Sequence, residues 1–248
     1  MDVDNPTNKN VKISVITATY NAAQCLPKLI ESLQQQTDKD FEWVVADGGS
    51  TDGTLELLEQ VTDITIKFTS QADFGIYDAL NRAIKQCDGD YYVVAGADDY
   101  FYNNAIADLR EAVTSSHADL ITATIKQNDQ LIKPLNKSPW LYGMRSYVSS
   151  HSIGTLFKKS LHNQFGYYSN KLPITADNLF ILKVMQNNST KLKQIPAVIG
   201  CFGADGLSGS DIIGTLTENF RTQLMIGSNK YLQLVTLFLR LLKNSFRY

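Results

Sequence analysis

Two hydrophobic patterns alternate along the first half of the chain. Short apolar runs rich in β-branched and aromatic residues are typical of buried strands, and each is followed by apolar residues at helical spacing. Strands are expected at 11–19, 41–46, 64–69 and 91–97, and helices at 26–33, 54–61 and 76–87. Because continuous apolar strands alternate with helices, we predict an α/β fold in which a Rossmann-like, mainly parallel sheet is flanked by helices.

The pattern is looser after residue 119. We expect strands at 118–125 and 149–157, a loop-rich segment at 126–146, a capped helix at 175–184 and a glycine-rich loop at 200–210. The remainder predicts C-terminal amphipathic helices, because a wide apolar face is accompanied by a basic stripe. Two partners stay open for that face: an anionic membrane surface, or protein, either the same domain or a second subunit.

The composition indicates a hydrophobic core and an uneven distribution of charge along the chain. Hydrophobic residues make up 44% of the 248 residues, which excludes wholesale disorder. The net charge of −2 conceals 8 basic and 20 acidic residues in 1–120, against 15 basic and 5 acidic in 121–248. An acidic half that binds phosphates needs cations, and a basic half suits an anionic acceptor or membrane. No nucleic-acid partner is expected.

Localisation is predicted from what the sequence contains at its start, its cysteines and its longest apolar run. The first residues have no apolar segment typical of a secretory signal, and the run at 231–242 is too short and polar to span a bilayer. The three cysteines are far apart, which argues against a disulfide framework or a zinc site. We expect a cytoplasmic protein, with peripheral attachment to the inner face of the cell membrane left open.

Polar side chains cluster where the predicted strands end, and parallel sheets bind ligands at that edge. The sequence contains neither a G-x-G-x-x-G nor a P-loop motif, so phosphates need another ligand. Asp98 and Asp99 follow an apolar strand, and adjacent carboxylates of this kind suit Mg²⁺ or Mn²⁺ bridging a diphosphate. The alternative is that one of them caps a helix beginning near Asn104.

Asp47 ends the second predicted strand and precedes two glycines. Its carboxylate there can accept a hydrogen bond from a ligand N–H, such as the edge of a base. Equally, Asp-Gly-Gly-Ser is favourable turn chemistry, with Ser50 or Asp52 capping the next helix. Both interpretations remain open for Asp47 on its own.

Five sequence blocks, taken together and in order, carry a family resemblance. They are VITATYNA, VVADGGSTDGT, DFGIYDALNRAI, GDYYVVAGADD and TADNLFILKV. Their order and spacing resemble family 2 glycosyltransferases with the GT-A fold, above all the bacterial group that builds colanic acid, O-antigen and capsule repeat units. The resemblance is densest over 11–101 and continues to about residue 210.

The resemblance implies an inverting glycosyltransferase. Such an enzyme moves a sugar from a nucleotide diphosphate sugar to a hydroxyl of a glycan or lipid-linked acceptor in bacterial surface polysaccharide synthesis. The chain would then divide into a nucleotide-sugar half at 1–125, an acceptor half of the same GT-A domain at 126–215, and a C-terminal helical segment at 216–248.

Donor-binding residues follow from the matching positions. Thr17 and Thr19 match the segment that contacts the nucleotide, and Asp47 matches the carboxylate that binds the edge of the nucleobase. Asp73 lies in the block that closes over the nucleotide sugar.

The remaining matches concern metal and acceptor. Asp98 matches the final acid of the family's DxD-type motif for Mg²⁺ or Mn²⁺, with Asp99 beside it. Asp177 matches the catalytic base that takes the proton of the acceptor hydroxyl. His151 matches a histidine that precedes this helix, and we expect it to contact the acceptor or a phosphate.

Three departures from the family pattern change these expectations. Gly96 occupies the first position of the metal motif, where Asp or Asn is common, and Arg82 is displaced by one position from the family's Ala-Arg-Asn. No Gln-x-x-Arg-Trp motif occurs, so cellulose- or chitin-type polymerisation is not expected. Two alternatives remain: a nucleotidyltransferase, disfavoured because 17–23 has no basic residue, and a degenerate sugar-nucleotide-binding or scaffold protein, favoured by Gly96.

Overall fold

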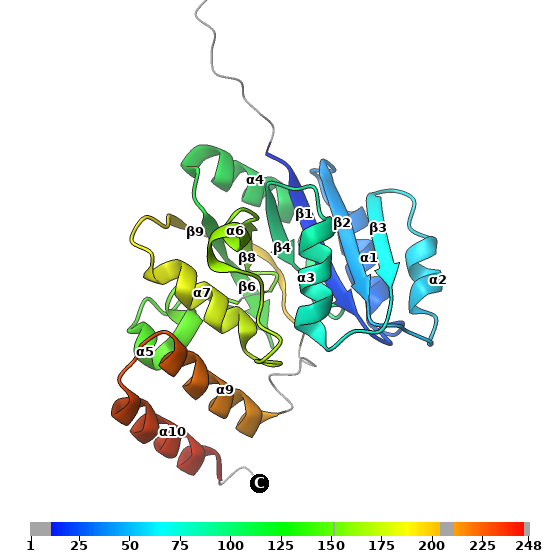
Figure 1. Cartoon of the computed structure of the whole chain (residues 1–248). Helices are drawn as coiled ribbons and strands as arrows, with labels where there is room; N and C mark the ends of the chain where they lie inside the picture. The colour runs from blue at the N-terminus through cyan, green and yellow to red at the C-terminus, as the bar shows by residue number, and fades with distance from the viewer. Residues whose placement is uncertain (1–10, 151, 204–210, 246–248) are drawn as a thin grey trace, which may run out of the picture.

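The computed structural model describes residues 11–150, 152–203 and 211–245 (Figure 1). Within them, nine strands form one sheet in the order β3-β2-β1-β4-β8-β6-β9-β5, with β7 paired to β6. The strands are β1 (Ile13–Thr19), β2 (Phe41–Asp47), β3 (Thr65–Ser70), β4 (Tyr91–Val94), β5 (Tyr100–Phe101), β6 (Leu120–Gln127), β7 (Gln130–Ile132), β8 (Thr155–Lys158) and β9 (Leu192–Cys201). The helices are α1 (Leu26–Gln34), α2 (Thr54–Glu59), α3 (Ile76–Gln86), α4 (Ala105–Ser116), α5 (Pro139–Tyr142), the 3₁₀ helix η1 (Gly143–Ser146), α6 (Leu161–Phe165), α7 (Ala176–Gln186), α9 (Ile212–Met225) and α10 (Lys230–Ser245).

The first four strands are parallel, and the helices predicted between them are α1, α2 and α3. Because these strands run in the same direction, their carboxyl ends lie at one edge of the sheet, the carboxyl edge. The loops after β1, β2 and β4 meet at this edge. One boundary differs from the prediction, because β4 ends at Val94 rather than at residue 97. The chain turns there, and the Asp99 N–H donates to the Gly96 carbonyl at 3.1 Å.

The second half of the sheet is mixed. β8 runs antiparallel to both β4 and β6, β9 runs parallel to β6, and β5 runs antiparallel to β9. The predicted strand at 118–125 is β6, whereas the one at 149–157 begins only at Thr155. β9 was not expected from the sequence, because Pro196 interrupts its apolar run and the register against β6 shifts nearby.

One continuous sheet therefore joins the two predicted halves of the domain. β6 crosses residue 125, and β8 pairs directly with β4. The loop-rich segment expected at 126–146 contains β7, α5 and η1. The division of labour between a donor half and an acceptor half stays a prediction.

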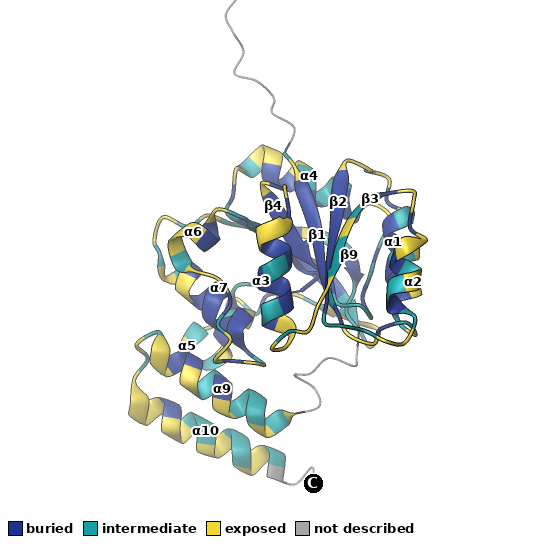
Figure 2. Ribbon diagram, turned by 45° about the vertical axis from the view of Figure 1, so that its right-hand side comes forward, coloured by how far each residue is buried: buried dark blue, intermediate teal, exposed yellow. Residues whose placement is uncertain are grey.

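Helices cover both faces of the sheet (Figure 2). The apolar side chains of α1, α2 and α4 pack on one face, and those of α3, α6 and α7 pack on the other. β1 serves both, since Val15 belongs to the first cluster and Ile16 to the second. This double burial is why β1, β2 and β4 are largely apolar. The edge strand β3 has no fully buried residue and alternates instead.

The predicted C-terminal helices are α9 and α10. α9 packs against α7, and α10 packs against α9 on the side away from the sheet (Figure 1). In the described part of the chain, no helix combines the length and the apolar character that crossing a membrane requires.

A buried imidazole lies beneath α7. His162 stacks on Phe180 and Tyr167, with ring centroids 4.4 and 4.9 Å apart. Its Nδ1 lies 3.0 Å from the Gly166 carbonyl oxygen and its Nε2 lies 2.7 Å from the Tyr92 hydroxyl. Because a carbonyl oxygen can only accept, the proton is on Nδ1, and Nε2 accepts from Tyr92. Burial lowers the pKa of His162 to about 4.

This lowered pKa predicts a dependence of stability on pH. Between about pH 4 and pH 6.5 the unfolded chain binds a proton at His162 that the folded chain does not, so stability falls as pH is lowered through that window. The contribution has a slope of at most about 1.4 kcal/mol per pH unit. Denaturant unfolding of the wild type and of His162→Phe at pH 7 and pH 5 measures it. The variant should lose less stability on acidification, and an equal loss in both proteins would contradict the assignment.

Candidate active site

The loops that follow β1 and β2 are tied together at the carboxyl edge. Asn21 accepts the Thr51 N–H at 3.0 Å, and its own N–H donates to the Ser50 hydroxyl at 2.8 Å. Asp52 accepts the Ala23 N–H at 3.0 Å. These bonds fix the relative position of two loops before any ligand binds.

Asp47 is fully buried and joins three strand ends. It lies beside Thr19 in β1 and Ser70 in β3, and both hydroxyls donate to its carboxylate, at 2.8 and 2.7 Å. The N–H groups of Gly49 and Ser50 donate as well. Burial alone would raise the pKa of Asp47, but the hydrogen bonds from Ser50, Ser70 and Thr19 outweigh it and lower the pKa. The carboxylate is therefore an ionised turn anchor, and its contact with a nucleobase stays a prediction.

The two predicted threonines are also engaged within the protein. Thr17 is fully buried, and its hydroxyl accepts a hydrogen bond from the Trp43 indole at 2.9 Å. Thr19 is bonded to Asp47 as described. Contact of either residue with the nucleotide stays a prediction.

Asp73 reaches the same edge from the loop before α3. Its carboxylate accepts the Gly75 N–H at 2.9 Å and lies against Gly48, where an added Cβ would approach Asp73 Oδ2 to 2.8 Å. Arg82 Nη2 lies 4.0 Å from Asp73 and donates to the Asp47 carbonyl at 2.7 Å. Arg82 thus reaches this edge despite its displacement in the sequence.

The Arg82 guanidinium is incompletely bonded. Its Nε and Nη1 are buried and have no hydrogen-bond partner among the described residues. A buried donor without a partner costs free energy, so these two nitrogens keep unused donor capacity even though the guanidinium charge lies 4.0 Å from Asp73.

Asp98 and Asp99 occupy different environments. Asp99 is fully buried and accepts from Gly96 N–H, the Ser152 hydroxyl and Gly203 N–H, at 2.7, 2.7 and 2.8 Å. Burial raises its pKa to about 6, and the neighbouring Asp98 adds to the shift. Asp98 is half-buried, with a carboxylate that lies beside Gly203.

Capping of the following helix, the alternative for this acidic pair, is wrong. α4 begins at Ala105 with Asn104 as its N-cap residue. The Ile106 N–H of its first turn donates to Gln36 at 3.1 Å. The bonds of Asp99 go instead to the β4–β5 turn and to two distant loops.

The fit to a divalent metal rests on Asp98. No group of three or more His, Cys, Asp or Glu in the described residues could hold a metal. Mg²⁺ commonly uses one or two protein carboxylates together with substrate phosphates and water. Asp98 fits that arrangement as a ligand shared with a diphosphate, whereas Asp99 has its oxygens occupied by three donors.

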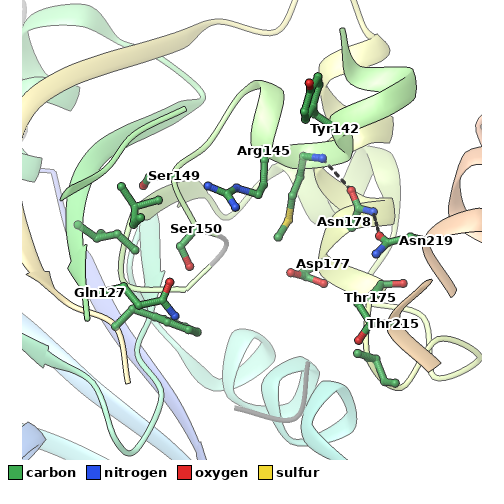
Figure 3. Close-up of a pocket in the computed structure, with 15 residues that line it drawn as sticks. Gln127, Tyr142, Arg145, Ser149, Ser150, Thr175, Asp177, Asn178, Thr215 and Asn219 are labelled. Carbon is green, nitrogen blue, oxygen red and sulfur yellow. Dashed lines mark hydrogen bonds between the residues drawn. The ribbon is translucent and has the colours of Figure 1, made fainter. Parts of the chain in front are cut away.

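A cavity of about 420 Å³ lies where α7, α5, η1 and α9 meet β6 and the loop before β8 (Figure 3). Asp177, in the first turn of α7, lines this cavity with 4% of its surface exposed. Its Oδ1 lies 2.6 Å from the Tyr77 hydroxyl, which also lies 2.9 Å from the Ile174 carbonyl. Burial, with the charge of Asp177, raises the pKa of Tyr77 well above its usual value, so the phenol stays protonated as a donor.

Helix α9 holds the start of α7 in place. Glu218 accepts the N–H groups of Ile174 and Thr175 at 3.0 and 2.9 Å, and the Thr175 hydroxyl at 3.2 Å. Asn178 donates to Asn219 at 2.6 Å. The predicted helix is confirmed, but Thr175 makes no side-chain cap bond and donates to Glu218 instead. Glu218 was not identified from the sequence, where one acid on a long helix carries no distinguishing signal.

The cavity contains other polar side chains that the sequence did not identify. Arg145 of η1 points toward the cavity, across from Asp177 (Figure 3). In the described lining, Arg145 and Asp177 are the two charged residues, accompanied by Tyr142 and Gln127. The expected contact of His151 lies outside the described residues.

The carboxyl edge and the cavity of Asp177 are connected through short segments of the chain. Asp99 bonds to Ser152 and Gly203, and these follow the cavity-lining Ser150 and Phe202 closely in sequence. Tyr77 makes a second connection. It lies in α3, which follows the Asp73 loop, and its hydroxyl is hydrogen-bonded to Asp177. The carboxyl edge and the cavity are therefore connected through these residues.

Comparison with known proteins gives consistent relatives. The PGL/p-HBAD biosynthesis glycosyltransferase of Mycobacterium bovis is 24% identical over 92% of this chain and 89% of its own. The poly(ribitol-phosphate) β-N-acetylglucosaminyltransferase TarS of Staphylococcus aureus is 26% identical over 71% of this chain, which spans 33% of TarS.

Solved structures share the fold. A crystal structure of S. aureus TarS 1-349 in complex with UDP-GlcNAc matches with a TM-score of 0.69 and 21% identity, over 91% of this chain and 70% of the other. The mannosyltransferase PcManGT of Pyrobaculum calidifontis, in complex with GDP-Man and Mn²⁺, matches with a TM-score of 0.67 and 18% identity, over 96% and 76%. The fold is therefore that of GT-A glycosyltransferases, as predicted.

The family itself is shown by sequence. Residues 14–178, well over half of the chain, match the profile described as Glycosyl transferase family 2. This range begins in β1 and ends just after Asp177, so it includes both the carboxyl edge and the start of α7. The chain belongs to glycosyl transferase family 2.

Proposed function

We propose that this protein transfers one sugar, with inversion, from a nucleotide diphosphate sugar to a hydroxyl of a glycan or lipid-linked acceptor in bacterial surface polysaccharide synthesis. The observation that carries the proposal is the position of Asp177. Asp177 faces a cavity of about 420 Å³ and is hydrogen-bonded to Tyr77 of α3, the helix that follows the Asp73 loop. TarS structures with UDP and UDP-GlcNAc support the donor class.

Asp177 is the proposed general base. As the acceptor oxygen attacks the anomeric carbon, its proton passes to the carboxylate, and the nucleotide diphosphate leaves from the opposite face of the sugar. Tyr77 positions the carboxylate by a 2.6 Å hydrogen bond to Oδ1. A single displacement of this kind needs no enzymic nucleophile and inverts the anomeric centre.

The donor diphosphate is assigned to the carboxyl edge of the sheet. Mg²⁺ or Mn²⁺ held by Asp98 would supply charge neutralisation for the leaving diphosphate. Asp99 supports the turn that presents Asp98, through its bonds to Gly96 and Gly203. Thr17, Thr19, Asp47 and Asp73 form the frame of the nucleotide site in this proposal.

The acceptor is assigned to the cavity. Arg145 gives that cavity a guanidinium, which suits an acceptor with a phosphate or carboxylate near its reacting hydroxyl. The relative TarS bears a name that specifies a poly(ribitol-phosphate) substrate. The excess of basic residues in 121–248 agrees with an anionic acceptor.

A binding protein without transferase activity is the second candidate. It is favoured by Gly96 and by the full bonding of Asp99, which leave one open carboxylate in the acidic pair. Release of nucleoside diphosphate from a panel of UDP-, GDP- and dTDP-sugars separates the two candidates. An enzyme hydrolyses at least one donor or transfers its sugar, whereas a binding protein leaves every donor intact.

Asp177→Asn should separate catalysis from binding. An amide cannot take the acceptor's proton, so sugar transfer should slow by at least about a hundredfold. Donor affinity should stay within about twofold of the wild-type value, because the carboxyl edge of the sheet is unchanged. The melting temperature should fall by no more than a few degrees. The matched control is Asp211→Asn, which makes the same change at the N-cap of α9. Wild-type turnover in Asp177→Asn would remove this residue from the mechanism.

Asp98→Asn tests the metal ligand. In the wild type, Mn²⁺ should strengthen donor binding, as measured by calorimetry with and without a chelator. The variant should lose that metal-dependent gain and transfer sugar at least about tenfold more slowly, since a neutral amide binds a hard cation poorly. Asp63→Asn, at an exposed turn, is the control. Metal-dependent binding that persists in Asp98→Asn would exclude this carboxylate as the ligand.

A further inference from the structure

Helix α10 is oriented with polar side chains toward the protein. Gln233 is 3% exposed, and its side-chain amide donates to the Trp140 carbonyl of α5 at 2.7 Å. One heptad later, Arg240 is half-buried and donates to the Leu141 carbonyl. These two residues are on one side of the helix, and that side docks on α5.

The opposite side of α10 is apolar and exposed. Its large hydrophobic side chains keep 46–67% of their surface open to solvent, and they are Tyr231, Leu232, Leu234, Val235, Phe238, Leu239 and Leu242. At 3.6 residues per turn these seven positions form one continuous arc of about 160°. Figure 2 shows α10 at the outer edge of the molecule, beyond α9, with exposed residues along its length. Contiguous apolar surface of this kind marks an interaction site.

The charges around the apolar arc of α10 indicate which kind of partner it would bind. Lys230 and Lys243 are exposed, and their positions in the helical repeat fall at the two edges of the apolar arc. Between residues 219 and 245, all described, there is no acidic residue, while Arg221, Lys230, Arg240 and Lys243 are basic. Lysines that border an apolar face can extend to anionic headgroups while the face enters the acyl region.

A second copy of the chain fits this surface less well. Packing α10 against itself antiparallel would bring Lys230 of one copy near Lys243 of the other, and parallel packing would pair each lysine with its equivalent. Both arrangements oppose like charges at the rim of an apolar contact, with no acid in α10 to compensate.

We propose that the outer face of α10 lies in the headgroup region of an anionic lipid bilayer. The apolar arc supplies the burial, and the flanking lysines supply attraction to acidic headgroups. The contacts of Gln233 and Arg240 with α5 fix the helix with that face outward, so no refolding is needed to expose it.

The proposed attachment bears on the acceptor, a step that rests on the proposed function. α5 accepts both hydrogen bonds from α10, and the next residue, Tyr142, lines the cavity of Asp177. A bilayer on α10 would therefore be close to the acceptor cavity. That arrangement suits a lipid-linked acceptor whose lipid stays in the membrane while its sugar enters the cavity.

Co-sedimentation with vesicles tests the attachment in the absence of donor. The full chain should sediment with vesicles of phosphatidylcholine and phosphatidylglycerol in equal parts, and much less with phosphatidylcholine alone. The double variant Val235→Glu, Phe238→Glu should bind at least about tenfold more weakly, because it places two charges at the centre of the arc. Leu131→Glu, Ile213→Glu is the matched control at two exposed apolar positions elsewhere and should bind like the wild type.

Two further measurements complete the test. Lys230→Gln, Lys243→Gln should weaken binding to the anionic vesicles, as should high salt. Donor binding, measured separately, should be unchanged in every variant, and its absence in the wild type would contradict the proposed function without affecting the attachment. Wild-type protein that stays in the supernatant would overturn the proposal. So would a wild-type dimer that Val235→Glu, Phe238→Glu converts to a monomer, because the face would then belong to a second copy.

Discussion

The hydrogen bonds of the buried Asp47 carboxylate are the interaction on which the carboxyl edge of the sheet depends. Thr19, Asp47 and Ser70 lie in register at the ends of three adjacent parallel strands, and their side chains form one hydrogen-bonded row. A buried charge is tolerated only when its oxygens are satisfied, so this row holds β1, β2 and β3 at a fixed stagger. The loops that follow these strands start from that fixed position, and the proposed nucleotide site is built from those loops.

Acidic residues at the site have two different physical roles. Asp47, Asp99 and Glu218 are buried acceptors of several protein donors, and each fastens a turn or a helix start. Asp98 is more exposed, and Asp177 faces a cavity. The first group holds the second in place, because Asp99 supports the Asp98 turn and Glu218 supports the beginning of α7.

Much of the fold could be predicted from the sequence, for reasons specific to its elements. Three of the parallel strands, β1, β2 and β4, were recognisable because both of their faces are buried, which makes them largely apolar. β9 was missed because Pro196 and a shifted register disturb its pattern. β8 is four residues long, too short for its boundaries to show in periodicity.

The candidate site was predictable in position but not in detail. The clustering of acids after strands located the carboxyl edge, and the ordered blocks indicated Asp177. The sequence could not distinguish Asp98 from Asp99, because their difference arises from Ser152 and Gly203, more than fifty residues away. Arg145 and Glu218 escaped notice for the same reason, since their roles exist only once η1 and α9 meet α7.

In the proposed mechanism, a single displacement assisted by Asp177 moves a sugar from a nucleotide diphosphate donor. Proton NMR of the anomeric signal during turnover of the best donor in the panel tests it most directly, with water as acceptor if no other is known. A single displacement should give a first sugar product with the opposite anomeric configuration to the donor, before mutarotation mixes the two forms. A first product that retains the donor's configuration would require a different mechanism and would rule out the single displacement.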